Sequence, residues 1–236
     1  QAQTSSGHLS LSTADAGRAG VSGQLSLFSG VSTAGSSGGV KIASGSAIGG
    51  AGGDIGLSVG AGDTGAGGSI RVVAGDTTDT ASGGAIEISS GASLASSSGS
   101  VLISTASTVT HGRSGDIELS TGESVRDASG ELRLSTGPSR TGPSGNIELA
   151  VGAAGAGNGG DVRVTAGEGV ETGGSLLLSS GVGTESGRVV IASAEGVDSS
   201  GSVSLGTGAV SSGSSGVLDL ATGSAFAGSA GNVNIA

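Results

Sequence analysis

The sequence predicts an all-β solenoid, or β-helix, of 16 stacked coils with about 15 residues per coil and a thin aliphatic core. Three observations support this. A Gly–x–aliphatic–x–aliphatic motif recurs along the whole 236-residue chain. Its two aliphatic positions alternate with polar ones, as in a strand with one buried face. Finally, 52 glycines and an aromatic content of 1% suit a narrow interior rather than a thick globular core.

The motif predicts one continuous array over 1–236, in which only residues 1–6 form a lead-in. We number each copy from its glycine, which is position 1. The positions after the first strand are less regular, and the copies that begin at 160, 174 and 187 are one or two residues short there. We expect this return path to tolerate change. The copies begin at residues 7, 23, 38, 53, 68, 84, 99, 115, 130, 145, 160, 174, 187, 201, 216 and 231.

Positions 3 and 5 are the predicted core, because stacking at about 4.8 Å would place each aliphatic side chain over its equivalent in the next coil. Position 7 is small, and position 8 is usually glycine, which we expect to form a tight corner with a positive φ. Position 11 is often apolar, as at Ile48 and Leu94, and predicts a weaker second strand that points inward. The predicted ladder includes Leu9, Leu11, Leu25, Leu27, Ile117, Leu119, Leu132, Leu134, Ile147 and Leu149.

Position 4 carries charges of alternating sign in four successive copies, namely Glu118, Arg133, Glu148 and Arg163. A track for anions or polysaccharides is one interpretation. We favour a register role, because alternating charges in a parallel stack favour the correct pairing and penalise a slip by one coil.

No catalytic, cofactor or metal site is predicted, so we do not expect an enzyme. Cysteine is absent, and the two histidines, His8 and His111, are far apart in sequence. Aspartates at position 2 do not recur regularly, and the period differs from that of the calcium-binding nonapeptide repeat. The net charge of −10 disfavours nucleic acid, and no apolar run is long enough for a membrane span.

The leading functional hypothesis is a structural rod segment of an extracellular fibre, sheath or surface appendage. An ice-binding solenoid is the first alternative, since Ser and Thr recur at positions 6 and 7. Phe28, Val73 and Ala150 interrupt the column at position 6. A glycan-binding or adhesive surface is the second alternative.

The segments GSVSLGTG, GDIELSTG and GGSLLLSSG resemble Gly/Ser/Thr-rich tandem-repeat proteins predicted in microalgae, many of them thought to be extracellular. The resemblance covers all 16 copies and implies a secreted or cell-surface protein that forms filaments. We therefore expect the chain to be a segment of a longer stack, or to bind other copies end to end or laterally. We also expect O-linked glycans on its many exposed hydroxyl groups.

Overall fold

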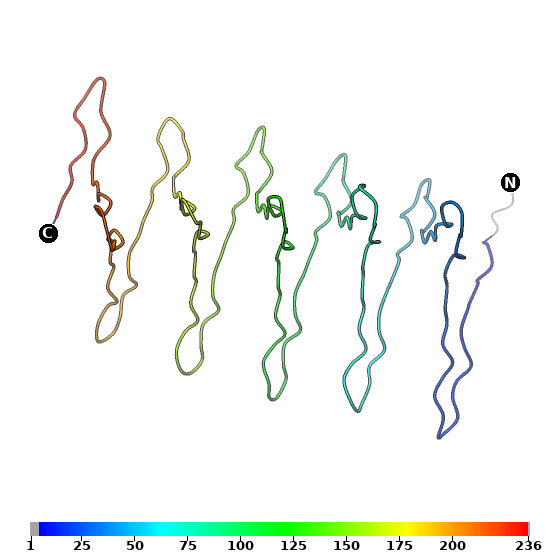
Figure 1. Cartoon of the computed structure of the whole chain (residues 1–236). Helices are drawn as coiled ribbons and strands as arrows, with labels where there is room; N and C mark the ends of the chain where they lie inside the picture. The colour runs from blue at the N-terminus through cyan, green and yellow to red at the C-terminus, as the bar shows by residue number, and fades with distance from the viewer. Residues whose placement is uncertain (1–4, 236) are drawn as a thin grey trace. The chain divides into compact units, whose positions relative to one another are not determined.

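The computed structural model describes residues 5–235, so residues 1–4 of the predicted lead-in and residue 236 lie outside the described residues. Between residues 5 and 235 the chain forms no helix and no strand, and therefore no sheet. The predicted all-β solenoid, or β-helix, is wrong. Each of the first 15 copies instead consists of an extended segment, here called the leg (positions 1–7), followed by a loop that contains a bend (Figure 1).

Residues 5–235 form no hydrophobic core. The accessible surface of the chain is 23729 Å². A compact protein of 21.5 kDa would expose about 9,200 Å², and an unfolded chain of that mass about 31,200 Å². Among residues 5–235 none is buried, and only Ser29, Ala74 and Ala166 are half-buried. All three occupy position 7, so in these three copies the closest packing lies at the end of the leg.

The loops bend later than the sequence predicts. Each of the first 15 copies bends once, starting at position 10, 11 or 12. Six glycines at positions 12 to 14 adopt a positive φ, which a side chain would disfavour. The predicted corner at position 8 is therefore wrong, because the bends begin two to four residues later. The six glycines are Gly35, Gly49, Gly65, Gly112, Gly157 and Gly213.

Hydroxyl side chains at position 10 stabilise several of these bends. In four copies such a hydroxyl oxygen accepts a hydrogen bond, 3.0–3.4 Å long, from a backbone N–H two or three residues later. Bonds of this kind compete with regular secondary structure and initiate turns. The residues that accept are Thr77, Ser93, Ser124 and Ser139.

Each loop closes at a neck, where positions 7 and 8 of one copy meet position 1 of the next. A Cβ atom added at Gly23 or Gly130 would lie 3.4 Å from the Cγ2 atom of the threonine at position 7 of the preceding copy. Small residues at position 7 and glycine at position 1 thus belong to one contact. In four necks the position-1 N–H also donates to the position-8 carbonyl, at 2.9–3.1 Å: Gly84 to Gly75, Gly99 to Gly91, Gly174 to Gly167 and Gly187 to Gly181.

The neck explains why the repeat does not form a solenoid. A solenoid of one coil per copy would place position 1 beside position 1 of the next copy, about 15 residues away. In this structure position 1 lies beside position 7 of the preceding copy, for example Gly38 beside Ser29 and Gly201 beside Ser193. This shorter loop closes at a lower entropic cost. The legs then have no neighbouring strand to pair with, so the aliphatic ladders do not form.

The three shortened copies need a glycine at position 10. A Cβ atom at Gly169 would overlap the carbonyl oxygen of Thr172, and one at Gly183 would lie 2.8 Å from the carbonyl oxygen of Glu185. Gly196 is restricted in the same way by the carbonyl of Ser199. Backbone atoms cannot move aside as a flexible side chain can. The missing one or two residues therefore tighten the loop until only glycine fits.

The chain divides into two units, Gln1–Glu118 and Leu119–Ala236. The boundary falls inside the leg of the copy that begins at residue 115. The first unit holds the seven copies that begin at residues 7 to 99. The second unit holds all three shortened copies.

Candidate functional site

The predicted ladder residues are exposed, so they form no core. At position 3 the side chains keep 51–63% of their surface exposed, except Leu9 at 91%. At position 5 the exposed fraction is 62–87%. The same two aliphatic positions are thus presented to solvent in copy after copy. The ladder residues named from the sequence follow this rule: Leu9, Leu11, Leu25, Leu27, Ile117, Leu119, Leu132, Leu134, Ile147 and Leu149.

The apolar residues at position 11 do not point inward. They lie at the bends, where their exposed fraction is 91–109%. The predicted second strand is therefore absent, and these side chains are the most exposed apolar groups of their copies. They are Ile48, Leu94, Val109, Val125, Val170, Val197 and Phe226.

The four charges assigned to register are not brought together. Arg133 forms its ion pair with Glu131 of its own leg, with 3.3 Å between Nη2 and Oε1. No ion pair among residues 5–235 joins Arg133 to Glu118 or Glu148. The other ion pair, Arg113 to Asp116 at 3.5 Å, is also local. Both pairs are highly exposed, so each contributes at most about 1 kcal/mol. A register role needs the stacked strands, which the structure lacks.

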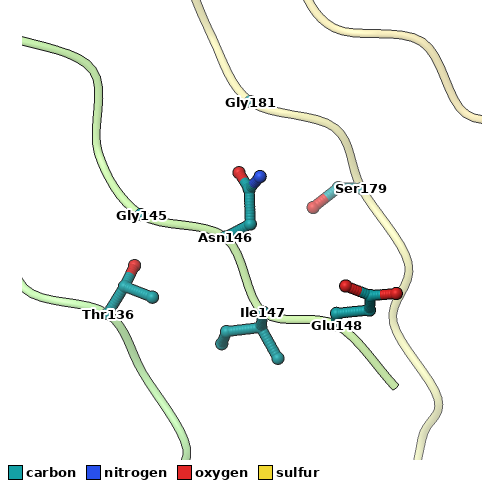
Figure 2. A pocket seen from close by; sticks show the side chains of 7 residues that line it. All are labelled: Thr136, Gly145, Asn146, Ile147, Glu148, Ser179 and Gly181. Carbon is teal, nitrogen blue, oxygen red and sulfur yellow. The ribbon is translucent and has the colours of Figure 1, made fainter. Parts of the chain in front are cut away.

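An open groove of about 970 Å³ lies within the second unit, between segments 145–148 and 179–181. Its sides carry Glu148 and the hydroxyl of Ser179, whereas Ile147 is turned to the other side of its segment (Figure 2). This alternation is the period of two that an extended leg imposes. The groove has no second charged side chain and no histidine. It therefore offers neither an acid–base pair nor a set of metal ligands.

Residues 5–235 contain no group of three His, Asp or Glu side chains that could hold a metal ion. The same residues contain no helix that is both long and apolar enough to cross a membrane. Of the Ser/Thr column considered for ice binding, threonines at position 7 such as Thr13 and Thr121 lie at necks, against the glycine that begins the next copy.

No protein-family model, curated protein or solved structure matches this chain.

One local feature was missed at the level of sequence. Position 10 is a hydroxyl residue in six copies, four of which accept turn hydrogen bonds there, and it is glycine in all three shortened copies. The signal was present in the Ser/Thr and Gly content of this column. The apolar residues at position 11 indicated a second strand, whereas in most copies the bend begins at that position.

Proposed function

We propose that the chain is a structural, non-catalytic component of an extracellular fibre, sheath or surface appendage. One observation carries this proposal: the same pair of aliphatic side chains is exposed in each of the 16 copies at a regular spacing. A repeated, identical surface suits repeated, identical contacts better than it suits a single ligand.

Two further features support an extracellular location. The chain resembles tandem-repeat proteins thought to be extracellular. Its loops are rich in exposed serine, as in 96–98 and 211–212. These are the groups that O-linked glycans modify.

Immunogold labelling of the native source tests the proposal. Antibodies raised against the purified chain should label fibres, a sheath or an appendage outside the plasma membrane. Label confined to the cell interior would overturn the proposal. Permeabilised and intact cells, compared in parallel, control for access of the antibody.

A further inference from the structure

We propose that Asn158 is a site of spontaneous deamidation, where the chain converts its own asparagine to aspartate and isoaspartate without an enzyme. The chain has four asparagines, and Asn158 is the one that a glycine follows. The others, Asn146, Asn232 and Asn234, each precede Ile or Val. This inference is independent of the structural function proposed above, because it concerns a reaction of the chain with water.

The reaction is a ring closure between the Asn158 side chain and the next peptide unit. The backbone nitrogen of Gly159 loses its proton to hydroxide and attacks the amide carbon, Cγ, of Asn158. A bond forms between this nitrogen and Cγ, the bond from Cγ to Nδ2 breaks, and Nδ2 takes a proton from water and leaves as ammonia. Water then opens the cyclic imide at either carbonyl carbon. Opening at Cγ gives aspartate, whereas opening at the main-chain carbonyl gives isoaspartate.

Ring closure depends on access to the Gly159 nitrogen. A side chain on the residue that follows asparagine hinders the attack, and a β-branched side chain carries two heavy atoms on Cβ close to that nitrogen. Glycine has no Cβ, and its backbone rotates more freely toward the conformation that ring closure requires. A Cβ atom added at Gly159 would meet no heavy atom within 4 Å, so the surrounding space is open.

The loop leaves the reacting groups unrestrained. Asn158 is exposed and lies in loop 152–159, whose other residues are all glycine or alanine. Position 10 of this loop is Ala154, so the loop lacks the hydroxyl that accepts turn hydrogen bonds in four other copies. The Gly159 N–H donates to no backbone carbonyl among residues 5–235. Neither a turn nor a neck hydrogen bond therefore holds the nitrogen that must react.

Deamidation would change both the charge and the length of this loop. The new carboxyl group is ionised near neutral pH, so the net charge becomes more negative than −10. The loop itself carries no charged residue, and Asp161 lies just beyond it. Isoaspartate also adds a methylene group to the main chain beside the neck, where a Cβ atom on Gly160 would lie 3.0 Å from Cγ1 of Val151.

Peptide mapping by mass spectrometry tests the proposal on the full chain. After incubation at physiological temperature and mildly alkaline pH, trypsin releases peptide 141–163, which contains both Asn158 and Asn146. We expect a gain of about 1 Da, because OH replaces NH₂, and fragmentation should locate it at Asn158. The rate should fall at mildly acidic pH, since hydroxide removes the amide proton. Asn146 is the internal control and should stay unmodified over the same period.

The variant Gly159→Val should lower the rate at Asn158 to that at Asn146. Its matched control is Gly155→Val, which adds the same side chain to the same loop and should leave the rate unchanged. At both glycines the added Cβ would meet no heavy atom within 4 Å, so neither substitution crowds the loop backbone.

Equal rates in the two variants would overturn the proposal, as would an Asn158 that reacts no faster than Asn146 in the unmodified chain. Electron-transfer fragmentation separates aspartate from isoaspartate. Aspartate alone would also overturn the proposal, because direct hydrolysis of the side chain gives aspartate only. These outcomes leave the extracellular function untouched, because the immunogold experiment tests that separately.

Discussion

Heating or urea should unfold this chain with an unusually small change in heat capacity. The accessible surface of 23729 Å² leaves only about 7,400 Å² to be exposed on complete unfolding, against about 22,000 Å² for a compact protein of the same mass. Compact proteins show about 12–15 cal/mol/K per residue, or roughly 3 kcal/mol/K for this length. Since the heat capacity follows the exposed surface, we expect about 1 kcal/mol/K here.

Differential scanning calorimetry measures this quantity directly. It should be performed at concentrations where sedimentation shows a monomer, because association would bury further surface. A broad, weak transition with a heat-capacity change near 1 kcal/mol/K is the expected result. A sharp transition with a change near 3 kcal/mol/K would refute the reasoning, since it requires a buried core that the structure does not contain.

Three further predictions concern single positions. Leu119 is 64% exposed, so Leu119→Asp should lower the free energy of unfolding by about 1 kcal/mol or less in urea titration, much like Glu118→Ser; a loss of several kcal/mol would reveal a core there. Gly169→Ala should open its loop and abolish protection of the Gly174 amide, which donates to the Gly167 carbonyl at that neck; a Gly174 amide that stays protected would contradict this. Intact-mass analysis of native protein should exceed 21.5 kDa through O-linked glycans on loops such as 96–98; the bare chain mass alone would contradict this.

The sequence predicted the unit of repetition and its small residues better than the contacts between distant segments. The spacing identified the unit of repetition, and the small residue at position 7 proved to matter. Its partner, however, is the glycine of the following copy, as at Thr121 and Gly130, and not an aliphatic layer. A period of two shows which side chains share a face. It does not show what covers that face, because this depends on contacts between distant segments.

The predicted site residues illustrate the same difficulty. Glu118, Arg133 and Glu148 recur at one position, and a column of alternating charges predicts pairing only if that column stacks. Arg133 has a closer partner in Glu131, two residues away. A local partner costs little ordering of the chain, whereas a partner 15 residues away requires the intervening loop to be fixed as well.

The free energies of loop closure and of side-chain burial decide whether the aliphatic residues of this repeat are buried. Closing a loop of about nine residues rather than 15 saves only about 0.4 kcal/mol of chain entropy per copy. Burying the still-exposed part of one aliphatic pair would contribute about 2–4 kcal/mol. A coil that captured this gain within one chain would also have to order the loop, about eight residues at about 1–2 kcal/mol each, which is more than two aliphatic side chains offset. The single chain therefore closes each short loop at its neck, and its aliphatic pairs remain exposed. Among residues 5–235 nothing covers these side chains, so the free energy that their burial would contribute is not realised within the chain.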